Sequence, residues 1–203
     1  MPPGVEPDVI DGSSWVGLIG FRMVGAGLGT GLPVPYLGSF AEINVRLYSR
    51  GPDGTRGVVF VTLDASRLAV VVAARAASIP YVWSRCRAHS SLGATPRYGY
   101  DVVRFRGNTR SSFVVEPAHG TTAEDELSLE LTARFGLHSR FGNRTVYIPN
   151  IHEPWPLHPA TVSSLDDGLL AAAGFTVAGP PESVLYSPGV QTRFGVPRVV
   201  RRS

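Results

Sequence analysis

A hairpin pattern at residues 40–64 constrains the fold more strongly than any other feature of the chain. The stretch FAEINVRLYSR (40–50) alternates between two faces, as a strand with one face toward a core does. One face carries Ala41, Ile43, Val45 and Leu47, and the other carries Glu42, Asn44, Arg46 and Tyr48. A turn-forming GPDG follows at 51–54, and GVVFVTLD (57–64) reads as a second strand. The segment predicts an antiparallel β-hairpin.

Most of the remaining chain also has strand character. We predict further strands at 13–23, 81–88, 97–107, 111–117, 144–151 and 183–194, and helices at 65–78, 123–135 and 163–175. Asp64 or Ser66 is the expected N-cap of the first helix, and a buried strand is the alternative interpretation of this segment. Thr121 with Glu124 forms a capping-box pattern before the second helix. Many strands with a few helices predict one α+β domain over 1–203, on an antiparallel sheet or barrel.

Composition excludes several classes of protein. No run approaches the roughly 18 apolar residues that a membrane span needs, and the first twelve residues lack the pattern of a signal peptide. The single cysteine, Cys86, cannot form an internal disulfide. Together these three features predict a cytoplasmic protein with no membrane partner. The net charge is only +3 and the arginines are scattered, which argues against a nucleic-acid partner. All 19 basic residues are arginine, so no lysine can form a Schiff base.

Glu42, Asn44 and Arg46 form the first candidate site. Alternate strand residues lie about 6.5–7 Å apart, so the row places a carboxylate, an amide and a guanidinium side by side. Such a row can bind a small polar ligand or hold a general acid/base. A sheet face in contact with solvent has the same pattern, and alternation alone leaves both interpretations open.

The stretch IHEPWPLHPA (151–160) is a second concentration of polar and aromatic residues. Its three prolines break any regular spacing of His152 and His158, so we predict no metal site there. A histidine tied to a backbone carbonyl and packed beside Trp155 is the simpler interpretation. The glycines of GAGLGTGLPVPYLGS (25–39) do not open a helix, because Pro33 and Pro35 follow. We therefore predict a loop without a dinucleotide, and no cofactor.

Five separated stretches resemble an uncharacterised bacterial family (a domain of unknown function) of the acetoacetate decarboxylase-like superfamily. They are PPGVEPDVIDGSSWVGLIGFRM, FAEINVRLY, GVVFVTLDASRLAVVVAARAASIPYVW, IHEPWPL and VLYSPGV. The resemblance covers nearly the whole chain and implies a closed antiparallel β-barrel or cone with flanking helices and an enclosed cavity. Relatives usually carry a further helix and strand before the PPG stretch, so we expect an N-terminal truncation.

The resemblance also assigns site residues. Glu42 matches the glutamate of an aromatic-x-Glu strand that reaches the decarboxylase active site, and Arg75 matches an arginine that precedes the Schiff-base lysine. Tyr81 stands where that lysine would be. His152 and Trp155 match a His-Glu-Ala-Trp segment. Glu42 and Tyr81 are thus candidate catalytic residues.

The missing lysine decides the expected function. A Schiff-base decarboxylase is excluded, and the resemblance then implies binding of a small oxo-acid-like ligand in the barrel, with Asn44, Arg46, Arg75, His152 and Trp155 as binding residues. The alternative is a lysine-independent lyase or hydratase that uses Glu42 as general acid/base. The sequence leaves open whether the chain is an enzyme and whether it forms a homo-oligomer.

Overall fold

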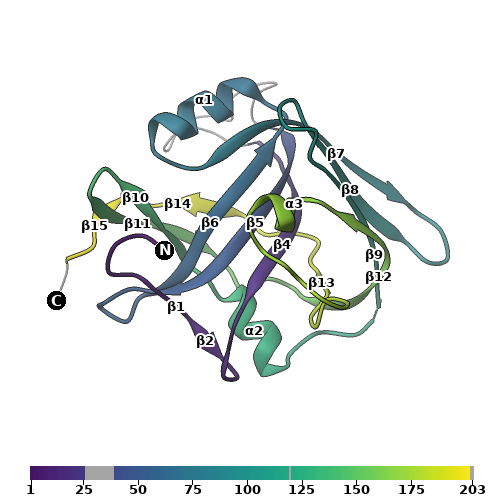
Figure 1. Cartoon of the computed structure of the whole chain (residues 1–203). Helices are drawn as coiled ribbons and strands as arrows, with labels where there is room; N and C mark the ends of the chain where they lie inside the picture. Colours follow the sequence, from purple (N-terminus) through teal and green to yellow (C-terminus); the bar gives the residue numbers. More distant parts are fainter. Residues whose placement is uncertain (26–38, 119, 202–203) are drawn as a thin grey trace.

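The hairpin predicted by the alternating pattern is confirmed as β5–β6, and it lies at the centre of the structure (Figure 1). The computed structural model describes residues 1–25, 39–118 and 120–201, so the loop predicted at 25–39 lies outside the described residues apart from its two ends. β5 (Phe40–Arg50) pairs antiparallel with β6 (Arg56–Ala65). Both strands cross the middle of the molecule in Figure 1, and the rest of the sheet extends from them.

Thirteen strands of the described chain form one branched sheet. Besides β5 and β6 they are β1 (Glu6–Pro7), β4 (Val16–Met23), β7 (Tyr81–Ser91), β8 (Arg97–Arg104), β9 (Arg110–Pro117), β10 (Gly136–Phe141), β11 (Arg144–His152), β12 (His158–Asp167), β13 (Leu185–Tyr186), β14 (Thr192–Phe194) and β15 (Arg198–Val199). β2 (Val9–Ile10) and β3 (Ser13–Ser14) form a separate pair. The strands predicted around β4, β7, β8, β9 and β11 are confirmed, with shifted ends.

The sheet forks at β6, and this fork overturns the predicted closed antiparallel barrel. Early in β6, Val58 lies opposite Leu137 of the parallel strand β10, whereas Leu63 near its end lies opposite Tyr81 of the parallel strand β7. Figure 1 shows β7–β8 and β10–β11 leaving β6 toward opposite sides of the molecule. Among the described strands, β13 and β14 at the two ends of the path do not pair with each other, so the sheet stays open.

The helix predicted at 65–78 is confirmed as α1 (Leu68–Ala76), but its predicted N-cap is wrong. Arg67 occupies the N-cap position and makes no side-chain cap hydrogen bond, so neither Asp64 nor Ser66 serves there. The Asp64 carboxylate instead accepts hydrogen bonds from Ser84 and Arg104. In the described parts of the chain, no helix is both long and apolar enough to cross a membrane.

The second helix, α2 (Glu126–Thr132), is shorter than the predicted 123–135. Its N-cap is Asp125, whose side chain accepts a hydrogen bond from the Ser128 backbone N–H at 2.9 Å. The expected capping box of Thr121 and Glu124 is therefore wrong, because the helix begins one turn later.

The helix predicted at 163–175 is only partly helical, and its first five residues belong to a strand. β12 occupies 158–167 and pairs antiparallel with β9, and only α3 (Leu169–Ala172) is helical. Asp167 separates the two elements, since its carboxylate oxygens accept from the backbone N–H groups of Leu169 and Leu170 at 3.0 Å. The last predicted strand, 183–194, is likewise divided into β13 and β14.

Both faces of β5 are buried, and each faces a different part of the core. The apolar face, with Ile43 and Val45, packs against Val102 of β8 and Leu169 of α3. The polar face lies between two other clusters. These consist of Ile10, Tyr48, Val58, Leu131 and Leu137 on the α2 side and of Phe40, Ala65 and Val71 on the α1 side. The polar face of β5 is thus an interior surface.

Candidate functional site

Glu42 and Tyr81 meet on the polar face of β5 because of the register of three strands. Glu42 lies opposite Ala65 of β6. Two residues earlier on β6, Leu63 lies opposite Asn44 of β5 on one side and opposite Tyr81 of β7 on the other. Tyr81 is thus one row away from Glu42 on the same face, within reach of a long side chain. Its hydroxyl donates a hydrogen bond of 2.7 Å to Glu42 Oε2.

The surroundings of Glu42 favour its protonated form. Its side chain is deeply buried, with 1% of the residue exposed, and this burial raises its pKa. Hydrogen bonds from Tyr81 and Asn44 lower the pKa, and the nearby charge of Asp64 raises it again. The resulting pKa is about 7, so the carboxyl group exchanges its proton near neutral pH.

Tyr81 stays protonated beside this carboxyl group. Burial and the Glu42 charge both raise the pKa of its phenol. The ring packs with the cluster around Phe40, Ala65 and Val71, which α1 completes. Tyr81 is therefore a fixed hydrogen-bond donor in this position, and not a base.

Asp64 is a neighbour of the site, although its place in the sequence predicted only a helix cap. It is fully buried on the opposite face of β6, where it accepts from Ser84 Oγ at 2.6 Å and from two nitrogens of Arg104 at 2.8 Å each. Its one visible signal was an acidic residue at the end of the apolar run GVVFVTLD. Its negative charge contributes to the raised pKa of Glu42.

Arg46 is a buried cation that has no acidic partner among the described residues. It is 8% exposed, and its Nη2 donates a long hydrogen bond of 3.4 Å to the Leu131 carbonyl of α2. The guanidinium also lies 5.4 Å from the centre of the Tyr48 ring. Within the described part of the chain, no carboxylate forms an ion pair with it, and its Nε has no hydrogen-bond partner.

Arg75 joins two elements and does not enter this row. It lies in the last turn of α1, is exposed, and donates from Nε to the Tyr81 carbonyl at 2.7 Å. This bond fixes the start of β7, from which the Tyr81 side chain projects. Arg75 therefore positions Tyr81 through the backbone.

His152 and Trp155 form a separate corner at the end of β11. His152 Nδ1 lies 2.7 Å from the Glu153 carbonyl, and its ring lies between those of Phe135 and Trp155 at centroid distances of 5.0 and 6.0 Å. The prediction of a histidine tied to backbone and packed beside Trp155 is confirmed. No hydrogen bond or ring contact among the described residues joins this pair to Glu42.

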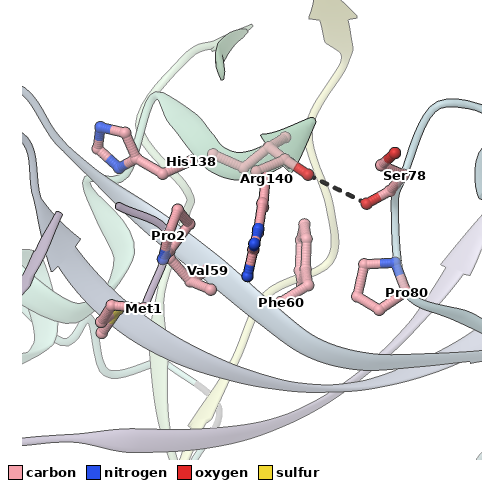
Figure 2. A pocket seen from close by; sticks show the side chains of 10 residues that line it. Met1, Pro2, Val59, Phe60, Ser78, Pro80, His138 and Arg140 are labelled. Atoms are coloured by element: carbon pink, nitrogen blue, oxygen red, sulfur yellow. Dashed lines mark hydrogen bonds between the residues drawn. The ribbon is translucent and has the colours of Figure 1, made fainter. Parts of the chain in front are cut away.

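A pocket of about 250 Å³ occupies the fork where β10 and β7 leave β6. Its walls include Phe60, Ser78, Pro80 and Arg140, and Figure 2 shows Arg140 beside Phe60 in the middle of it. A hydrogen bond of 3.2 Å from Ser139 Oγ to the Ser78 carbonyl spans the fork. None of the predicted site residues lines this pocket, although Pro80 directly precedes Tyr81.

The polar groups at the site are a carboxyl, an amide, a phenol hydroxyl and one guanidinium. Among the described residues, no group of three or more His, Cys, Asp or Glu side chains is placed to hold a metal ion. Cys86 lies on the other face of the sheet, in the cluster with Ile43 and Val45, and burial raises the pKa of its thiol. Cys86 is thus a packed residue and no nucleophile of this site.

Comparison with known proteins identifies the family. The model of the DUF2071 family, described as "Uncharacterized conserved protein (COG2071)", matches residues 1–191. The chain belongs to this family. The DUF2071 chain is also 27% identical over 189 residues to "Uncharacterized protein YqjF" of Bacillus subtilis (strain 168), which covers 90% of this chain and 74% of that protein.

Solved structures of the enduracididine biosynthesis enzyme MppR have a similar fold. The complex with pyruvate superimposes with a TM-score of 0.63 and 12% identity, covering all of the DUF2071 chain and 82% of MppR. The complex with the condensation product of pyruvate and imidazole 4-carboxaldehyde gives 0.64 and 14%, covering all of this chain and 81% of MppR. At this identity the likeness concerns the fold alone.

Proposed function

We propose that the protein binds a small oxo-acid-like ligand on the polar face of β5, without Schiff-base chemistry. The observation that carries this proposal is Arg46, a buried guanidinium with no carboxylate partner among the described residues. A buried charge without a counter-charge costs several kcal/mol, and an anionic ligand would remove that cost. The planar guanidinium matches the geometry of a carboxylate.

The other end of the row suits a carbonyl group. Glu42 in its protonated form is a hydrogen-bond donor, and with a pKa of about 7 it holds that proton in a substantial fraction of molecules at neutral pH. A carbonyl oxygen is an acceptor only. The row thus combines a cation for a carboxylate with an acid for a carbonyl, which together describe an oxo acid. The binding of pyruvate by MppR, a protein of similar fold, supports the same class of ligand.

Calorimetric titration with pyruvate tests this proposal. Arg46→Met removes the charge and keeps an apolar stem, so we expect the affinity for pyruvate to fall at least tenfold. The matched control is Arg87→Met, which makes the same change at an exposed arginine of β7 and should leave the affinity unchanged. Equal affinity in the Arg46 variant and the control would refute the assignment of the carboxylate to Arg46.

A second candidate function is acid/base catalysis by Glu42, as a lyase or hydratase. Its pKa of about 7 favours this candidate, because a general acid/base works best when its pKa lies near the working pH. The carboxylate would take a proton from the carbon next to the ligand carbonyl, and the resulting acid would return it. Tyr81 would orient the carboxyl group during both steps.

Exchange of the methyl protons of pyruvate in deuterated water separates catalysis from binding. If Glu42 catalyses proton transfer, the protein accelerates the loss of the methyl proton signal, and Glu42→Gln slows that exchange by about a hundredfold or more. The Gln variant should still bind pyruvate in the calorimeter. Binding without accelerated exchange in the wild type would leave only the binding function.

A further inference from the structure

Asn44 is a buried amide that the protein satisfies on one side only. The residue is 1% exposed and lies between Glu42 and Arg46 on the polar face of β5. Its Oδ1 is buried and has no hydrogen-bond partner among the residues that the structure describes. A buried acceptor without a partner costs about 1–3 kcal/mol, so the position is unfavourable unless something donates to it.

The hydrogen bond to Glu42 determines which way the amide points. The Asn44 side chain lowers the pKa of Glu42, as an N–H donor to a carboxylate does, and of its two amide atoms Oδ1 is the one that is buried without a partner among the described residues. This bond uses the amide nitrogen. The oxygen, on the other arm of the planar amide, is left without this partner.

The chemistry of an oxo acid does not satisfy this oxygen. At neutral pH, a keto group and a carboxylate are both acceptors, and neither donates a hydrogen bond. A hydroxyl group donates one. A 2-hydroxy acid, or an oxo acid in its enol form, has a hydroxyl next to the group that Arg46 would bind.

We propose that the ligand of this site carries a hydroxyl group next to its carboxylate and donates it to Asn44 Oδ1. The inference rests on the proposed carboxylate-binding site, and it changes the group beside the carboxylate from a keto oxygen to a hydroxyl, as in 2-hydroxy acids and the enol forms of oxo acids. A site built to receive a ligand hydroxyl discriminates strongly against analogues without one, because its buried acceptor then stays unpaired.

The test compares three small ligands on the wild-type protein by calorimetry. Lactate carries the hydroxyl, 2-methoxypropanoate blocks it as a methyl ether, and pyruvate replaces it with a keto group. We expect lactate to bind about tenfold more tightly than either of the others. Equal affinity for all three would overturn the hydroxyl requirement but leave the proposed function standing. Absence of binding by all three would overturn both.

A pair of variants assigns the preference to its residue. Asn44→Leu removes the acceptor with little change of volume, and it should reduce the preference for lactate to about twofold or less. Asn150→Leu is the matched control, because Asn150 of β11 also has a buried Oδ1 without a partner among the described residues. It should keep the full preference. A preference retained in a folded Asn44 variant would contradict the proposal, and if that variant does not fold, the three-ligand comparison still decides.

Discussion

At the scale of single residues, the Glu42–Tyr81 hydrogen bond is the contact with the most direct chemical consequence. The phenol stabilises the charged form of Glu42, while burial opposes it. Tyr81→Phe removes the hydroxyl donor and keeps the aromatic ring. We therefore expect the pKa of Glu42 to rise above about 7, measured by carbon NMR of the labelled carboxyl group during a pH titration.

A second tyrosine provides the control for this measurement. Tyr147 is also buried and donates its hydroxyl to a backbone carbonyl, that of Phe135, at 3.0 Å. Tyr147→Phe should leave the pKa of Glu42 unchanged. An unchanged Glu42 pKa in the Tyr81 variant would show that the hydrogen bond does not control the proton.

Glu42 should also make stability depend on pH. Its pKa is about 7 in the folded protein and 4.5 as a free side chain, so the folded state binds the extra proton between those values. The contribution of this proton to the free energy of unfolding is fully present below pH 4.5 and is lost as the pH rises through 7. The total is about 3 kcal/mol, at about 1.4 kcal/mol for each pKa unit.

Urea denaturation of wild type and Glu42→Gln between pH 4.5 and 8.5 isolates this effect. The free energy of unfolding of the wild type should fall with rising pH relative to the variant, which cannot ionise there. The comparison is needed because His138 acts in the opposite sense. Burial lowers its pKa below 6.5, so its contribution is lost as the pH falls. Parallel curves for the two proteins would contradict the raised pKa of Glu42.

Several of these residues were visible in the sequence, but their interactions were not. Alternation placed Glu42, Asn44 and Arg46 on one face, and the family resemblance singled out Glu42 and Tyr81. The register of β5, β6 and β7 brings Tyr81 to Glu42, and a register is a pairing between distant segments that no local pattern specifies. For the same reason, the charge of Asp64 beside the site was missed.

At the scale of elements, a buried ionic network ties the N-terminal strands to the rest of the molecule. Asp8, between β1 and β2, is 1% exposed and accepts from Arg50 of β5, Arg56 of β6 and Arg134 after α2. Burial raises the pKa of Asp8, but hydrogen bonds from the three arginines outweigh it and hold the pKa at about 2. The network therefore joins four separate segments of the chain and persists until the pH falls well below 3.8.

Asp8→Asn should destabilise the protein by about 3–5 kcal/mol, because it leaves the buried Arg134 without its main counter-charge. Urea denaturation at pH 7 measures the loss. The control Asp166→Asn, at an exposed position of β12, should change the free energy of unfolding by less than about 0.5 kcal/mol. A loss below about 1 kcal/mol at Asp8 would show that the network does not hold the N-terminal strands.

Elements were predictable where the local sequence pattern favours the same structure that pairing with neighbouring elements produces. The hairpin of β5 and β6 and the helix α1 have local signals that point to the structure observed. The segment 163–175 does not, because its first residues extend β12 and pair with β9, and pairing with a neighbour outweighs a weak helical pattern. β10 went unpredicted because the short segment 136–141 has no alternation of its own and is held between β6 and β11.

At the scale of the whole molecule, the absence of lysine is testable as a chemical property. Incubation with pyruvate and borohydride traps any imine as a stable adduct that adds mass to the protein. We expect peptide mapping to find no adduct on any side chain between residues 2 and 203, because none carries a primary amine. A side-chain adduct would contradict this. An adduct confined to an N-terminal α-amine would leave the conclusion intact.

The sequence by itself determined the chemistry that is excluded and the residues available for a site. Without lysine there is no side-chain imine, and the alternating strand supplies the acid, the amide and the guanidinium in one row. The tertiary structure alone decided that this row is buried, that Tyr81 reaches Glu42 and that the sheet forks instead of closing. The physical reason is that burial, strand register and branching are set by contacts between segments far apart in the chain, and a local pattern is compatible with more than one such arrangement.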